Sequence, residues 1–599
     1  MAVTNGTQVV FRILLCCALV STVTIFLPLA LRPCAHSLSR TILATTGLDP
    51  QLICCTGATA TKASLPGAIG ATVNRAINGG RPIVTDVLRC GEPSLPPHAL
   101  PPFHCCPLTP PSEAAVVNFT FPNPAEPIRT RRPAHDAGDD MAKLERAVAI
   151  MKALPASDPR SFYPAGQRPL RLLHRRSPAS RVVAGDAIAD PLLVALLPVP
   201  PRIPLLLRAR RGEASRRPFL RHAVLGMGRE GMRAPPEFFS DESSSLYDAL
   251  RNPRHAPPRV VDLDFWCVEK NITYVEKNVT DAEQVELNLR IMYKAMVTNA
   301  PLPSLFHGQP YRAGDREMPG AGTVELALHN VVHEWTGDLE RPNYENMGAY
   351  YSSARDPIFY PHHANSDRLW EVWRGDAGDE RRPRHADFTD PDWLDSSFLF
   401  YDEEAMLVRV TVRDVLDVEK LRYTYADVGT PWLDARPPVT AGVSLRRRGP
   451  PALESVRFPV FLDAAVSAAV MRPWLPGNVR GRRGDVVEVL VVEGIEADGA
   501  DFVRFDVYVN AMEHEKVSPG AREAAGSFVS LKQPGMEVVQ TSMRVVLDEV
   551  MEDLGAEGDD SVTVTLVPVM GKVRIGGLRV VYMAEQDDSN STHEVHVLR

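Results

Sequence analysis

Two histidines in the segment LHNVVHEWTGD have the spacing of metal ligands. His329 and His333 stand at positions i and i+4, so on an α-helix both imidazoles project from one face and can reach one ion. The pattern alone is a weak signal, because a chain with 16 histidines contains such pairs by chance. A third imidazole on a facing element would favour a metal site.

A second histidine-rich segment, DPIFYPHHANSDRLWEVW, supplies that candidate. His362 and His363 lie near the start of a predicted helix, and Asp367 follows His363 by four residues. A helix–loop–helix hairpin of this length can fold an imidazole back onto the first pair. Asp367 would then share a face with His363, where a carboxylate can orient a ligand. Core histidines bonded to backbone carbonyls are the alternative, and the carboxylate behind three histidines disfavours it. Neutral imidazoles suit copper, zinc, iron or nickel, so the spacing leaves the metal open.

The elements that must position these side chains are helices. Apolar residues recur at helical spacing in four segments, and the second of them begins with a capping signal, Thr280 or Asp281 followed by Glu283. Helices are predicted over residues 140–154, 280–299, 325–335 and about 361–373.

The pattern changes to alternation after residue 440. Short apolar–polar runs separated by Gly and Asp turns, among them TSMRVVLDEV (541–550), are predicted to be strands and indicate an antiparallel sandwich or barrel. The proline-rich stretch at 431–442 predicts the boundary. We therefore expect a mainly α domain at 90–430, with the metal site in a four-helix bundle, and an antiparallel β-sandwich C-terminal domain at 431–599. Residues 1–89 are expected to be a targeting, processed or irregular segment.

Length, charge and cysteines add further limits. A chain of 599 residues exceeds one compact core, and a formal charge of -8 argues against a nucleic-acid partner. The apolar run from Val9 to Leu31 resembles a signal peptide or short signal anchor, so no stable membrane span is expected in the mature chain. Cys90, Cys105 and Cys106 stand in proline-rich sequence, which predicts a disulfide-stapled loop and an oxidising compartment.

The segment DPIFYPHHANSDRLWEVW closely resembles the second copper-binding motif of plant polyphenol oxidases (catechol oxidases), which belong to the tyrosinase and haemocyanin group. Other segments resemble motifs of the same family in the same order, covering 90–160 and 236–599. They are RRPAH (131–135), SSSLYDALRN (243–252), YRAGD (311–315), DWL (392–394), the pair Tyr423 and Tyr425, and RFDVYVN (504–510), with Arg504 where the family has Lys.

The resemblance implies a copper cofactor, a small phenolic substrate and O2, and oxidation of o-diphenols to o-quinones. It implies that Glu325 holds an active-site water and that Asn330 helps this water accept a phenol proton. Tyr350 stands where the family usually has a gating Phe, which would narrow or polarise the entrance. The implied copper ligands are His329, His333 and His363.

The family also implies a C-terminal domain that shields the copper site until it is removed, and a location in the plastid thylakoid lumen. The signal-like N-terminus suggests the secretory pathway as the alternative. Oligomeric state stays open.

Half of the expected dicopper centre is missing from the sequence. Three further imidazoles are expected between residues 160 and 236, but residues 164–236 contain fourteen Arg, no Lys, no Tyr and no Trp, with only His174 and His222. A basic proline-rich linker does not explain its abrupt edges. We hypothesise two compensating frame changes near residues 162–165 and 231–236. An uninterrupted transcript read that encodes this segment, with no alternative frame holding His and Trp, would refute the hypothesis.

The resemblance also bears on the cysteines, since one cysteine of the family's adjacent pair bonds a cysteine inside the missing block. Cys90 can still pair with Cys106, which leaves Cys105 without its partner. Because only the second copper site is present, the activity of this chain is expected to be impaired. The rival is a catalytically inactive relative binding at most one metal ion. A zinc hydrolase is disfavoured because no HExxH or nearby general-base Glu accompanies the ligands.

Overall fold

The structure is a computed structural model of the whole chain. The apolar run Val9–Leu31, the cysteines Cys90 and Cys106, and residues 163–236 lie outside the residues that it describes. The described ranges are 82–84, 95–100, 116–162, 237–264, 276–375, 385–440, 456–473, 486–584 and 593–594, apart from residues 156–157, 159, 257–258, 277, 311–312, 314–319, 403–404, 512 and 534–536.

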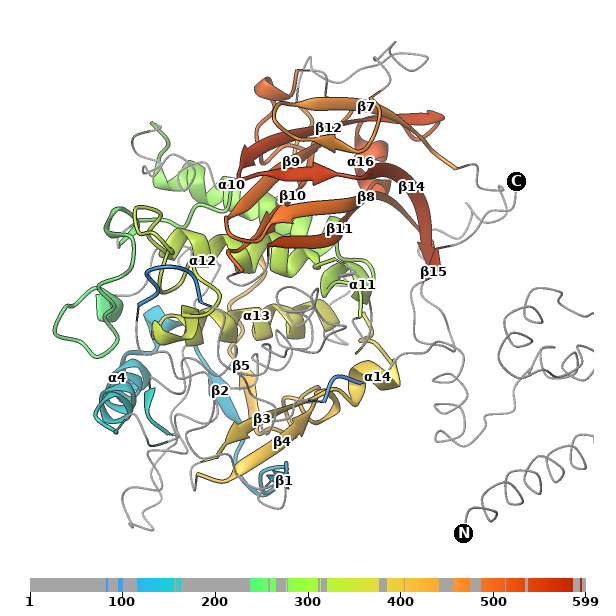
Figure 1. Cartoon of the computed structure of the whole chain (residues 1–599). Helices are drawn as coiled ribbons and strands as arrows, with labels where there is room; N and C mark the ends of the chain where they lie inside the picture. Colours follow the sequence, from blue (N-terminus) through green and yellow to red (C-terminus); the bar gives the residue numbers. More distant parts are fainter. Residues whose placement is uncertain are drawn as a thin grey trace, which may run out of the picture. The chain divides into compact units, whose positions relative to one another are not determined.

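All the described residues belong to one compact unit, Gly80–Arg599. The helical part and the strand-rich C-terminal part both lie in this unit, and Figure 1 shows their helices and strands. A boundary near residue 430 stays a prediction.

Four helices carry the helical part, and they fall where apolar periodicity predicts them. A π-helical turn adjoins two of them: Lys294–Thr298 directly follows α10, and Val324–His329 directly precedes α12. A π-helical turn inserts one extra residue and re-aims the side chains that follow, and such turns are frequent at functional sites. The helices are α4 (Gly138–Lys152), α10 (Asp281–Tyr293), α12 (Asn330–Thr336) and α13 (Phe359–Arg374).

The start of α10 confirms the predicted cap. The Thr280 hydroxyl accepts from the Glu283 amide at 3.3 Å, and the Glu283 carboxylate accepts from the Thr280 amide at 2.8 Å, which completes a capping box.

We expect Thr280→Ala to lower the free energy of unfolding by about 1 kcal/mol, because it removes the hydroxyl that satisfies a helix-end amide. Urea unfolding of the wild type and of Thr280→Ala measures the change. Thr280→Ser is the matched control, since it keeps the hydroxyl. An equal loss in the two variants would contradict the role of the cap.

Two small sheets lie beside the helices. In one, β1 pairs in parallel with β4, and β4 pairs antiparallel with β3; in the other, β2 pairs in parallel with β5, which contains Tyr423 and Tyr425. The bounds are β1 (Val116–Asn118), β2 (Arg129–Arg131), β3 (Ser397–Tyr401), β4 (Leu407–Thr411) and β5 (Tyr423–Tyr425), with the short helices α11 (Pro303–Phe306) and α14 (Pro391–Leu394).

The C-terminal part consists of two antiparallel sheets. One has the strand order β10-β9-β12-β7. In the other, β14 and β13 pair along one edge of β8 and β11 pairs along the opposite edge, with β15 next to β14 and β6 next to β13. Val492 of β8 and Phe505 of β9 meet in one apolar core between the sheets. The bounds are β6 (Val460–Phe461), β7 (Val466–Met471), β8 (Val487–Asp498), β9 (Val503–Val509), β10 (Ala524–Ser530), β11 (Val538–Val546), β12 (Ser561–Met570), β13 (Val573–Ile575), β14 (Gly577–Ala584) and β15 (His593–Glu594).

The predicted fold class, a mainly helical part followed by antiparallel sheets, is thus confirmed. One detail was wrong. The run TSMRVVLDEV was expected to be a strand throughout, but β11 ends at Val546 and the short helix α16 (Asp548–Asp553) follows. Asp548 and Glu549 lie in the first turn of this helix, where acidic side chains are favoured by the helix dipole.

Polar contacts join the C-terminal sheets to the π-helical turn after α10 and to Asn299, which follows it. Nζ of the buried Lys294 donates to the carbonyl oxygen of Ala524 at 2.6 Å. The Asn299 amide donates to the Ala525 carbonyl at 3.0 Å and accepts from the Val546 amide at 2.9 Å. The π-helical turn is therefore held against β10 and β11.

Candidate metal centre

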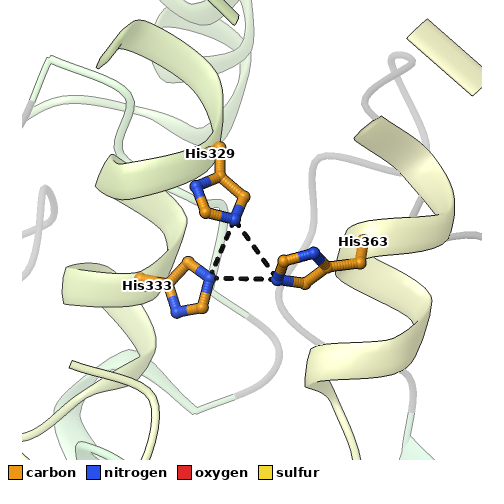
Figure 2. Close-up of side chains that lie close together, drawn as sticks. All are labelled: His329, His333 and His363. Atoms are coloured by element: carbon orange, nitrogen blue, oxygen red, sulfur yellow. Dashed lines mark hydrogen bonds between the residues drawn. The ribbon is translucent and has the colours of Figure 1, made fainter. Parts of the chain in front are cut away.

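Three imidazoles from two helices converge on one point. The Nε2 atoms of His329 and His333 lie 3.1 Å apart, and Nε2 of His363 lies 3.2 Å from the first and 3.3 Å from the second (Figure 2). His329 ends the π-helical turn, His333 follows one turn later on α12, and His363 lies on α13. Within the described ranges, these residues form the one group of His, Cys, Asp or Glu side chains that could hold a metal ion.

The spacing of these nitrogens fits a first-row transition metal. An ion about 2.0–2.1 Å from each ligand nitrogen separates tetrahedrally arranged nitrogens by about 3.3 Å. The three Nε2–Nε2 distances are close to that value. The donor set of three imidazoles also suits copper, so the residues present fit the metal that the family resemblance implies.

Hydrogen bonds at the far ring nitrogens direct two of the imidazoles. The Nδ1 atom of His329 lies 2.9 Å from Oδ1 of Asn330, and Nδ1 of His333 lies 2.8 Å from the carbonyl oxygen of Met347. Both oxygens can only accept, so each Nδ1 carries the proton and each Nε2 lone pair is left for a metal.

The third ring is directed by packing. Nδ1 of His363 has no hydrogen-bond partner among the described residues, and its ring stacks on Phe359, with centroids 3.8 Å apart. Phe359 lies four residues earlier on α13. His362 is fully buried beside the triad, with ring centroids 5.1 Å from those of His329 and His333, but its nitrogens lie outside the group that could hold an ion.

Burial keeps these rings neutral. It lowers the pKa of His329 to about 4, against a small opposing effect of the Asn330 hydrogen bond. Burial also lowers the pKa values of His333 and His363 well below their usual value. Neutral imidazole is the form that binds a metal, so the site needs no proton release from its ligands at neutral pH.

Asp367 was expected to orient a ligand imidazole, but the contacts of its carboxylate go to other side chains. Its carboxylate accepts from the hydroxyls of Tyr423 (2.7 Å) and Tyr425 and pairs with Arg131 at 3.2 Å. One turn beyond His363, it faces β5 and β2 instead of the triad. Burial raises the pKa of Asp367, while Arg131 and the tyrosine hydroxyls lower it.

The other expected site residues are placed as follows. Glu325 is buried on the π-helical turn, four residues before His329. Asn330 is buried and, besides His329, its Nδ2 contacts the carbonyl oxygen of Val529 in β10 at 3.2 Å. Tyr350 is half-buried against two apolar clusters. The structure brings the three histidines together, and the water-holding and gating roles stay predictions.

Sequence reasoning missed three groups around the triad. Phe359 carried a usable signal, since it precedes His363 by one helical turn. The carbonyl groups of Met347 and Val529 carried none, because every residue has one. Only the folded chain shows which carbonyl group meets a ligand.

Among the described helices, none combines the length and the hydropathy of a membrane span.

Three family models match the chain in succession. The common central domain of tyrosinase matches residues 220–376, the polyphenol oxidase middle domain residues 387–438, and the chloroplastic polyphenol oxidase C-terminal domain residues 458–582. The first match begins inside the arginine-rich segment and contains all three histidines.

Curated relatives and solved structures resemble the chain over most of its length. Aureusidin synthase of Antirrhinum majus is 40% identical over 519 residues, covering 81% of this chain and 85% of that protein. A chloroplastic polyphenol oxidase of Malus domestica is 37% identical, covering 83% and 84%. The structure of latent aurone synthase aligns with a TM-score of 0.73 at 30% identity, covering 84% and 100%. Latent apple tyrosinase aligns with a TM-score of 0.66 at 36% identity, covering 78% and 100%.

Proposed function

The chain belongs to the plant polyphenol oxidases, the tyrosinase-type dicopper oxidoreductases that act on phenols with O2, and on that premise we propose that it binds a single copper ion through His329, His333 and His363. The observation that carries the proposal is the convergence of three neutral Nε2 atoms within 3.1–3.3 Å of one another. Bound copper would supply the redox chemistry with O2 and the phenol.

The proposal of one ion follows from the sequence between the family motifs. Residues 164–236, where the other three ligands are expected, contain only His174 and His222. Oxidation of o-diphenols to o-quinones is therefore impaired in this chain, since the family reaction uses a copper pair. An inactive relative with at most one bound ion is the second candidate.

The chain's own residues have separate tasks in this proposal. Asn330 and the Met347 carbonyl hold the ligand rings, and Glu325, on the ligand helix, holds a water that takes the phenol proton. Tyr350 borders the entrance. Residues 90–430 form the copper domain and residues 431–599 the domain that covers it. The chloroplastic names of relatives support a plastid location, and we propose the thylakoid lumen, where a Cys90–Cys106 disulfide can form.

We expect one copper per chain after reconstitution, with no catechol-dependent O2 uptake above that of an equal amount of free copper. Elemental analysis of the desalted protein and an oxygen electrode measure the two quantities. Two coppers per chain together with catalytic uptake would overturn the single-site proposal. No retained copper would overturn the proposed copper site and leave only the inactive relative.

A further inference from the structure

A two-step hydrogen-bond relay runs from the C-terminal sheet to a ligand of the candidate metal site. The carbonyl oxygen of Val529, in β10, accepts from Nδ2 of Asn330 at 3.2 Å. Oδ1 of the same amide accepts from Nδ1 of His329 at 2.9 Å. Asn330 is buried, so water does not compete at either bond.

The chemistry of the three groups gives the relay one direction. A backbone carbonyl can only accept, so the NH2 end of the Asn330 amide must face Val529. That orientation turns Oδ1 toward His329, and an amide oxygen also can only accept. His329 must then carry its proton on Nδ1, which leaves Nε2 free for a metal.

Packing around the relay holds its ends together. Leu326, on the π-helical turn that ends at His329, belongs to the apolar core between the two C-terminal sheets. Val529 and Leu531, from the sheet side, belong to the core of the helical part. Each part thus contributes buried apolar side chains to the core of the other, close in sequence to Asn330 on one side and to its partner Val529 on the other.

We infer that the C-terminal sheet positions the ligand His329 through Asn330, so that Asn330 is a positioning residue and metal binding is coupled to docking of the sheet. The inference rests on the proposed function for the identity of the ion. It adds that the sheet supports the ligand set in addition to covering it. Coupling is reciprocal, so a metal ion at the triad also strengthens docking of the sheet.

The relay predicts the effect of three variants on Cu(II) affinity, measured by competition with a chromogenic chelator. Asn330→Leu removes the acceptor for His329 and should weaken binding roughly 10–100-fold, the cost of losing a group that orients a ligand. Asn330→Asp keeps the acceptor for Nδ1 of His329 but has no N–H to donate to the Val529 carbonyl, so it should keep more of the affinity than Asn330→Leu while losing the link to the sheet. Asn299→Leu is the matched control, because Asn299 bonds the same sheet at Ala525 and Val546 but contacts no ligand.

Two further readouts test the coupling in the full chain. Cu(II) should slow proteolytic separation of the C-terminal strands several-fold in the wild type and in Asn299→Leu, but not in Asn330→Leu or Asn330→Asp, which both lack the donor to Val529. In the copper-free chain, histidine 15N shifts should show the Nδ1–H tautomer of His329 and its loss in Asn330→Leu.

Equal loss of affinity in Asn330→Leu and Asn299→Leu would overturn the inference, since general loosening would explain both. Protection by Cu(II) against proteolysis that persists in Asn330→Asp would also overturn it, because that variant has no donor for the Val529 carbonyl. If the wild type binds no copper, the proposed function fails, and the tautomer of His329 still decides the relay. If Asn330→Leu does not fold, Asn330→Asp and its tautomer carry the test.

Discussion

Replacing His363 with leucine is expected to abolish stable copper binding to this chain. The variant leaves two imidazoles, and the loss of affinity should exceed the roughly 10–100-fold cost of removing a group that only orients a ligand. Leucine has a similar volume and no ligand atom, so the core around α13 keeps most of its packing. Copper retained after desalting, and chelator competition for what remains, measure the effect.

The neighbouring His362 provides a matched control for this variant. Both imidazoles are buried near the start of α13, but only His363 places a nitrogen within the triad. His362→Leu is expected to keep one copper per chain, with at most a small loss of affinity from the ring that packs near His329. If His362→Leu lost copper and His363→Leu retained it, the third ligand would be His362, and its assignment to His363 would be wrong.

The second large effect is expected at Asp367. Its carboxylate is the acidic partner of Arg131, and both side chains are nearly fully buried, at 1% and 3% exposure. Asp367→Ala leaves the Arg131 charge buried without its partner, so the free energy of unfolding should fall by about 3–5 kcal/mol. Urea unfolding of the copper-free chain, followed by tryptophan fluorescence, measures the fall.

A second substitution separates the lost charge pair from lost packing. Replacing both residues, Asp367→Leu with Arg131→Met, removes the unpaired charge and should recover much of the stability that Asp367→Ala loses. Recovery is limited by the hydroxyls of Tyr423 and Tyr425, which lose their acceptor. A loss below about 1 kcal/mol in Asp367→Ala would show that the pair contributes little.

Asp367 also tests what the residue does for the metal. Asp367→Asn should leave copper affinity near that of the wild type, because the carboxylate bonds to tyrosines and an arginine and not to an imidazole. A large fall in affinity would instead favour the role that the sequence suggested. The two roles therefore give different results in one variant.

Much of the fold followed from local patterns. Helical spacing placed α4, α10 and α13, and alternation placed most strands of the two C-terminal sheets, because amphipathic elements repeat their apolar residues with their own period. The π-helical turns escaped this reasoning, since a single extra residue barely changes the pattern. The helix α16 escaped as well, because the run before it alternates like a strand.

At the site, the sequence by itself indicated the family and the three histidines that converge, and the family resemblance favoured His363 over His362 as the third. The HxxxH spacing and the HH pair sit on helices whose geometry makes His329, His333 and His363 able to converge. Only the tertiary structure decided what surrounds them: Met347 and Asn330 at the ring nitrogens, Val529 behind Asn330, and Asp367 turned to β5. These contacts join segments far apart in the chain, and several use backbone carbonyl groups that every residue shares. These contacts therefore cannot be read from the amino-acid sequence and become visible only in the folded chain.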